Sequence, residues 1–177
     1  LVLEGLLKFS KVEESIRWFE MNFLEGTETP NLVSFEILID GLLNHWKEGE
    51  ALKFQNIMEN DFGIKPRIGI YNLWISYHLK NHQLDKALSL LREIKHNSSV
   101  FKPNEVTYRC FMKFYMEISD YKSVEDIKLQ MTNDEIVPSV QFYNSIIKSL
   151  AKKRAFKEID SLLHEMKANH QAKLHLS

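Results

Sequence analysis

The sequence predicts an all-α fold, an α-solenoid of repeated helical hairpins, from two observations. The chain contains four prolines, Pro30, Pro66, Pro103 and Pro138, and successive prolines are 36, 37 and 35 residues apart. Five residues after each proline comes an aromatic residue that opens an apolar run. A fixed period of about 20–50 residues is typical of repeat architectures, in which one supersecondary unit recurs along the chain.

The first helical patterns are incomplete. Leu1–Phe9 is apolar and is predicted to be the end of a helix. Lys11–Phe23 has apolar residues at close to helical spacing, and the breakers Gly26 and Pro30 should end that helix. The chain begins at Leu1 without a methionine, so we expect either a removed leader or a longer parent chain.

Each later repeat carries two helical patterns separated by a short polar break. The first pattern begins just after the proline, and its four copies are predicted over Leu32–His45, Ile68–Asn81, Glu105–Ile118 and Val140–Lys153. The second pattern is predicted over Glu48–Phe62, Leu84–Asn97, Tyr121–Asp134 and Phe156–His170. Ser34 and Thr107 are the predicted N-caps. Because neither helix can bury its apolar face alone, stacked hairpins should share a continuous core.

The overall composition is that of a globular protein, with 44% hydrophobic and 27% charged residues. The net charge of −1 provides no general attraction to nucleic acid or to an anionic membrane. No apolar run reaches the ~18 residues of a membrane span. Cys110 is the one cysteine in the sequence, so an internal disulfide is excluded and a reducing compartment is compatible with the chain.

The repeated segments resemble the P-type pentatricopeptide repeat, in which V-T-Y-N-x-L-I opens the first helix. The best copies are Val106–Tyr108 and Tyr143–Ile147. Glu4–Lys8 and Val12–Ile16 also match the family's D-G-L-C-K and V-E-E-A-L segments. The tetratricopeptide repeat has a similar period, but its W-x2-L-G-x2-Y opening is absent.

The resemblance implies a right-handed α-solenoid that forms one continuous domain. Its boundaries would give a partial repeat at 1–31 and four full repeats at 32–67, 68–104, 105–139 and 140–177.

The family binds single-stranded RNA in mitochondria and plastids, with about one base contacted per repeat. It uses the residue after the opening aromatic and the residue that closes the repeat. The resemblance therefore implies base contacts from Glu36 and Arg67, Asn72 and Asn104, Arg109 and Ser139, and Asn144. The Asn72/Asn104 combination implies a pyrimidine, since an amide offers a donor and an acceptor. Glu36 would repel a phosphate, and Arg109 would hold a phosphate or stack without selecting a base.

The family also sandwiches each base between branched apolar residues and holds phosphates with a lysine late in the first helix. The sandwiching position is matched by Val33 and Val106, while Gly69 and Gln141 depart from it. The lysine position is matched by three residues and interrupted by two: Lys8, Lys80 and Lys152 match, and Asn44 and Glu117 do not.

A basic cluster is the one charge feature above background. It comprises Lys148, Lys152, Lys153, Arg154 and Lys157. A run of charge on a helix is either a solvated face or, here, a patch that contacts phosphates.

The sequence contains no recognisable catalytic motif, phosphate loop or metal-ligand cluster, so we expect no enzyme activity, cofactor, metal or small-molecule substrate. His78 and His82 are four residues apart, but the glutamate of H-E-x-x-H is replaced by Leu79, which favours surface histidines. Cys110 is expected to be buried and inert. Trp46 and Trp74 are expected to pack between helices.

The leading functional hypothesis is an organellar RNA-binding protein, mitochondrial with the plastid as second choice. It would act in RNA processing, stability or translation by holding single-stranded RNA on the concave face of the solenoid. The alternative is a structural subunit of a large ribonucleoprotein such as the mitochondrial ribosome, contacting proteins and folded RNA. The near-neutral charge favours the alternative, whereas Asn72, Asn104 and the basic cluster favour the first hypothesis.

Overall fold

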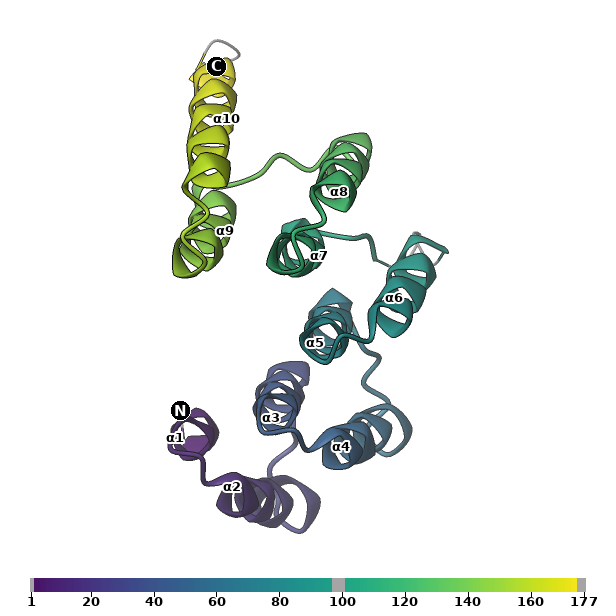
Figure 1. Cartoon of the computed structure of the whole chain (residues 1–177). Helices are drawn as coiled ribbons and strands as arrows, with labels where there is room; N and C mark the ends of the chain where they lie inside the picture. Colours follow the sequence, from purple (N-terminus) through teal and green to yellow (C-terminus); the bar gives the residue numbers. More distant parts are fainter. Residues whose placement is uncertain (1, 97–100, 175–177) are drawn as a thin grey trace. The chain divides into compact units, whose positions relative to one another are not determined.

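The computed structural model describes residues 2–96 and 101–174, and every element within these ranges is helical. The chain divides into two compact units, Leu1–Phe101 (unit 1) and Lys102–Ser177 (unit 2). Unit 1 holds α1 (Val2–Lys8), α2 (Val12–Phe19), the π-helical turn η1 (Glu20–Leu24), α3 (Leu32–Asn44), α4 (Glu48–Asn60), α5 (Ile68–Lys80) and α6 (Leu84–His96). Unit 2 holds α7 (Glu105–Glu117), α8 (Tyr121–Asn133), α9 (Val140–Lys152) and α10 (Phe156–Leu174) (Figure 1).

The predicted helical hairpins are confirmed. All helices from α3 to α10 begin at the predicted residue, and the first helices end one residue earlier than predicted. Among the second helices, α10 extends to Leu174 instead of His170, and the predicted end of α6 at Asn97 lies outside the described residues. In the described part of the chain, no helix combines the length and the apolarity that a membrane span requires.

Within each unit the hairpins stack through their first helices. The helix pairs α1/α2, α3/α4 and α5/α6 form hairpins in unit 1, as α7/α8 and α9/α10 do in unit 2. The first helices α1, α3 and α5 pack on one another in succession, and α7 packs on α9. In each unit the first helices therefore form a row, and these helices or their N-caps carry the predicted base-contacting residues.

Asparagines begin two of the first helices. Asn31 and Asn104 are the N-caps of α3 and α7, and their side-chain oxygens accept the backbone N–H groups of Ser34 and Thr107. The Ser34 and Thr107 side chains accept the N-cap N–H groups in return, which completes a capping box. The prediction of Ser34 and Thr107 as N-caps is therefore wrong, because each helix begins two residues before them.

All five first helices end in the same kind of turn. The residue two positions after the helix is left-handed in every case, with φ between 56° and 63°: Ser10, Trp46, His82, Ser119 and Arg154. At Trp46 the N–H donates to the Leu43 carbonyl at 3.2 Å, and the next N–H, that of Lys47, donates to the Leu42 carbonyl at 2.9 Å. This is the Schellman pattern, which usually uses glycine.

The core follows the repeat period. In the four full hairpins, each second helix carries a small or branched residue and, seven residues later, a Met or Ile; these two are its seam positions. They are buried in the first three full hairpins: Ala51 with Met58, Ala87 with Ile94, and Val124 with Met131. The corresponding Ile159 and Met166 of α10 are half-buried.

The tyrosine near the start of a first helix forms a hydrogen bond with the second helix of the same hairpin. Tyr71 donates its hydroxyl to Glu93 at 2.7 Å, and Tyr143 donates to Glu165 at 3.0 Å. Burial and the neighbouring Glu93 raise the pKa of Tyr71 far above its ordinary value. Phe35 lacks the hydroxyl, and Ile57 stands 22 residues after it, as Glu93 stands after Tyr71. At this spacing Tyr71 and Tyr143 each meet a glutamate and Phe35 an apolar residue, whereas Tyr108 donates to Asp134, 26 residues after it.

Candidate nucleic-acid interface

The Glu36 side chain lies against the first turn of α5. A Cβ atom at Gly69 would come within 2.2 Å of the Glu36 Oε1 atom. Gly69 therefore leaves the space that the Glu36 carboxylate occupies. Burial raises the pKa of Glu36, and the positive charge of Arg67, the N-cap residue of α5, acts in the opposite direction.

The other predicted residues of α3 and α5 differ in exposure. Val33, a predicted sandwiching residue, is 58% exposed and open to a partner. Asn72 is only 6% exposed, because it lies within the packed row of first helices. A base that reached the Asn72 amide would meet a side chain that is largely covered in the isolated chain.

In unit 2 a carboxylate also links successive first helices. Glu105, the first residue of α7, accepts the Ser139 N–H at 3.0 Å and the Ser139 hydroxyl at 2.8 Å. The Ser139 hydroxyl oxygen also accepts the Phe142 N–H at 3.1 Å and so caps α9. The predicted base-contacting group of Ser139 is therefore engaged within the chain. Sequence reasoning missed Glu105, although its position 34 residues before Ser139, about one repeat away, is the signal that could have found it.

Asn104 has a structural role as well. Its Oδ1 atom accepts the Thr107 N–H at 3.1 Å and the Thr107 hydroxyl at 3.2 Å. Asn104 belongs to unit 2 and Asn72 to unit 1. Arg109 and Val106 are half-buried on α7, and Asn144 is exposed on α9. The base-contacting roles of these residues remain predictions.

The predicted phosphate-contacting row coincides with the ends of the first helices. Lys8 and Lys80 are the last residues of α1 and α5, and both are exposed. Lys80 donates to the Asn44 Oδ1 atom at 2.9 Å, while the Asn44 amide donates to Asp40 at 3.0 Å. Asn44 interrupts the lysine row in the sequence, yet in the structure it orients the lysine of the next repeat.

The basic cluster lies at the turn between α9 and α10, and all five of its side chains are exposed. Lys148 and Lys152 are one helical turn apart, Lys153 caps α9, and Lys157 lies in the first turn of α10. Lys153 donates to the backbone carbonyl of Glu117. No ion pair within residues 2–96 and 101–174 includes a member of the cluster. The cluster is therefore a concentration of cations exposed to solvent.

The structure changes three of the minor expectations. His78 is buried rather than on the surface, because its ring stacks on Trp74 and its Nδ1 atom lies 2.8 Å from the Gln83 Oε1 atom. Trp74 is packed as predicted, but Trp46 is 62% exposed, since it occupies the left-handed position of its turn. Cys110 is half-buried rather than fully buried.

Over the described ranges, no group of three or more histidine, cysteine, aspartate or glutamate residues is placed to hold a metal ion.

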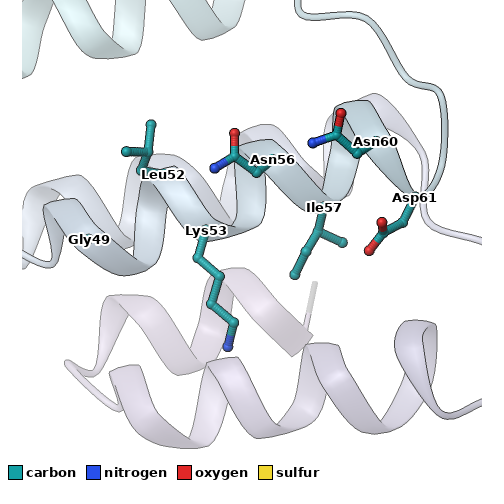
Figure 2. Close-up of a pocket in the computed structure, with 7 residues that line it drawn as sticks. All are labelled: Gly49, Leu52, Lys53, Asn56, Ile57, Asn60 and Asp61. Atoms are coloured by element: carbon teal, nitrogen blue, oxygen red, sulfur yellow. The ribbon is translucent and has the colours of Figure 1, made fainter.

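A shallow groove runs along α4 (Figure 2). Its volume is about 480 Å³, and its lining comes from α4 and the α4 C-cap, Asp61. Asn56 and Asn60 lie one turn apart on one side, whereas Lys53 points to the neighbouring helix, where its Nζ atom is 3.4 Å from Glu20. The groove brings no charged groups from different elements together, so it does not form a convergent site.

The comparisons with known proteins agree with the repeat geometry. A family model described as the pentatricopeptide repeat domain matches residues 89–153, and a PPR repeat model matches residues 69–99 and 142–170. Together they cover more than half of the chain. The structure is similar in fold to the maize pentatricopeptide repeat protein PPR10 solved in complex with an 18-nucleotide psaJ RNA element. The TM-score is 0.70 at 20% identity, covering 94% of this chain and 25% of that one.

Two relatives illustrate the sequence similarity. A pentatricopeptide repeat-containing protein of Arabidopsis thaliana is 27% identical over 168 residues, which cover 93% of this chain and 37% of the relative. A mitochondrial 15S rRNA processing factor of Zygosaccharomyces rouxii is 27% identical over 126 residues, which cover 68% of this chain and 14% of the relative. The chain thus spans well under half the length of both relatives.

Proposed function

Because the chain belongs to the pentatricopeptide repeat family, we propose that it is an RNA-binding module of an organelle and binds single-stranded RNA with little sequence preference. The observation that carries the proposal is the basic cluster. Five exposed cations gather at one turn of a chain whose net charge is −1. Phosphate contacts of this kind supply affinity without selecting a sequence.

The low sequence preference rests on the predicted base-contacting residues. The Ser139 hydroxyl is bonded to Glu105, and the Asn104 oxygen caps α7. Asn72 of unit 1 and Asn104 of unit 2 each remain a proposed base contact. One good base contact discriminates by only about 1–3 kcal/mol, so one specified position would leave a tolerant site.

The mitochondrion is the proposed compartment, with the plastid as second choice, and the processing of an organellar RNA is the proposed process. Similarity to the mitochondrial 15S rRNA processing factor supports both.

The test measures binding of the whole chain to an unstructured RNA as a function of salt concentration. Replacing Lys152, Lys153 and Arg154 with alanine should weaken binding to every sequence. The slope of log K against log salt should fall by about 0.7 for every phosphate that the variant no longer neutralises. An unchanged slope in the variant would refute the role of the cluster.

A structural subunit of a ribonucleoprotein is the second candidate. The near-neutral charge and the engagement of Ser139 and Asn104 within the chain favour it. In that case the isolated chain would bind no single strand even at low salt, and the native protein would sediment inside a large particle.

A further inference from the structure

Two aromatic residues are exposed at equivalent positions of unit 2. Phe156 is the first residue of α10 and is 67% exposed, and Tyr121 is the first residue of α8 and is 42% exposed. They are 35 residues apart, which is one repeat. Each follows the left-handed turn residue by two positions. The corresponding positions of unit 1 hold Val12, Glu48 and Leu84, none of which is aromatic.

The two aromatic positions are neighbours in space. The Glu158 side chain, two residues after Phe156 in the first turn of α10, is close enough to the Tyr121 hydroxyl to raise its pKa. Lys128 of α8 and Glu165 of α10, which stand seven residues after Tyr121 and Glu158, are 2.8 Å apart. The first turn of α8 therefore reaches the first turn of α10. Unit 2 consequently presents two exposed rings at adjacent hairpin turns.

Four members of the basic cluster, Lys152, Lys153, Arg154 and Lys157, lie within four residues of Phe156 in the chain. Residues 152–160 contain four cationic side chains and two carboxylates, Glu158 and Asp160, and the Glu117 carboxylate accepts the Ser149 hydroxyl at 3.5 Å. The surface is therefore positive around an exposed aromatic ring.

The charge favours RNA over a protein as the occupant. Lysine is depleted from the cores of protein–protein interfaces, whereas a basic groove with stacking aromatic rings is how proteins hold single-stranded nucleic acid. Bases of any identity have a face that can stack on such a ring.

We propose that Phe156 and Tyr121 form a stacking platform for unpaired RNA bases, with the basic cluster holding the adjacent phosphates. This inference rests on the proposed RNA-binding function and adds a second contact surface to it. The predicted base-contacting residues Ser139 and Asn144 lie at the start of α9 and the platform lies beyond its end. A 13-residue helix is about 20 Å long, so the two surfaces are separate.

The experiment compares the whole chain with Phe156→Ala and Phe156→Trp on two probes of equal length. One probe is a single-stranded RNA of mixed sequence, and the other is the same ribose-phosphate strand without bases. Phe156→Ala should weaken binding to the RNA roughly fivefold or more and leave binding to the baseless strand unchanged. Phe156→Trp should bind the RNA at least as well as the wild-type chain. Leu129→Ala is the matched control, because Leu129 is 61% exposed on α8 and lies outside the platform.

The outcomes separate the platform from the proposed function. If the wild-type chain binds RNA and Phe156→Ala binds it equally well, the platform is refuted and RNA binding stands. Equal losses on both probes would also refute stacking. If the wild-type chain binds neither probe at low salt, the proposed function itself fails.

Discussion

Units 1 and 2 use the same hairpins but differ in where part of their charge is placed. In unit 1, lysines pair with carboxylates of the preceding hairpin: Lys47 with Glu13 at 3.1 Å and Lys53 with Glu20 at 3.4 Å. The carboxylate between its first helices, Glu36, lies against Gly69 in a position where burial disfavours its charge. In unit 2, the carboxylate that links the first helices is Glu105, at the start of α7, which accepts two hydrogen bonds from Ser139, and the turn lysines face solvent.

The difference shows that the same hairpins can pair their lysines with carboxylates of a neighbouring repeat or present them to solvent at a turn. Lysines paired between repeats neutralise their neighbours and offer little to an anionic partner. Exposed pairs of this kind contribute only about 0–1 kcal/mol each to stability, so their loss should be tolerated. Unit 2 holds one such link, Lys128 with Glu165 at 2.8 Å, and keeps the basic cluster apart from it.

The largest expected effect is on the link between α7 and α9. Glu105→Ala removes both acceptors of Ser139 and leaves the Ser139 N–H without this partner. We expect it to lower the free energy of unfolding of unit 2 by about 1–3 kcal/mol. Asp160→Ala, at an exposed carboxylate of α10, should change it little.

Tryptophan fluorescence makes the measurement specific to a unit. The three tryptophans of the chain, Trp18, Trp46 and Trp74, all lie in unit 1. In urea titrations, Glu105→Ala should therefore shift the circular dichroism transition and leave the fluorescence transition in place. A fluorescence shift as large as the dichroism shift would show that the two units unfold together and would contradict the expectation of separate transitions.

The second largest effect is expected when lysines of unit 1 are released from their carboxylate partners, as the turn lysines of unit 2 already are. Replacing Glu13 and Glu20 with alanine removes the partner of Lys47 and the nearer partner of Lys53, which keeps Glu50 at 3.8 Å. Two exposed cations should then be available to phosphates. We expect RNA affinity to rise a few-fold and the salt slope to steepen by up to about 1.4, which is 0.7 for each additional phosphate neutralised.

The control must carry the same change in net charge. Glu25 and Glu28 are exposed in the segment between η1 and α3, and their double replacement by alanine also removes two negative charges. It should raise affinity less than the Glu13 and Glu20 replacements do. Equal gains from the two pairs would show that net charge, and not the release of particular lysines, controls binding.

The repeat period made the helices predictable from the sequence. Proline and the following aromatic residue mark each first helix, and seam positions such as Ala87 and Met131 recur at the same phase. These features depend on contacts within one hairpin, and the spacing of residues that are close in the sequence is enough to predict such contacts. The exposure of Trp46 was missed because it depends on a left-handed turn residue, a position where the sequence shows no glycine.

Contacts between repeats were the part that local pattern could not supply. Glu36 and Gly69 each depart from the family pattern when taken alone, and together they complement each other across α3 and α5. Ser139 matched a base-contacting position, but Glu105 from the preceding repeat engages its hydroxyl. Such pairs depend on how hairpins stack, which the one-dimensional pattern does not specify.

The smallest expected effect concerns Glu36. Burial raises its pKa above the ordinary value of 4.5, so the folded chain favours the protonated form more than the unfolded chain does. The stabilisation that follows from this raised pKa is complete below the pKa of Glu36 in the unfolded chain. It is lost as the pH rises through the pKa of Glu36 in the folded chain. Glu36→Gln cannot ionise and avoids this loss. It should therefore be more stable than the wild-type chain at pH 7, and the gain should disappear near pH 4.

Gly69→Ala tests whether burial of the Glu36 carboxylate against Gly69 is the cause of this stability gain. A Cβ atom at position 69 would displace the Glu36 carboxylate toward solvent, where its pKa should return toward 4.5. In the Gly69→Ala background, Glu36→Gln should then add no stability at pH 7. Urea titrations followed by tryptophan fluorescence at pH 4 and pH 7 measure both variants and their combination. If the gain from Glu36→Gln is independent of pH, or persists beside Ala at position 69, then desolvation of the carboxylate against Gly69 is not its source.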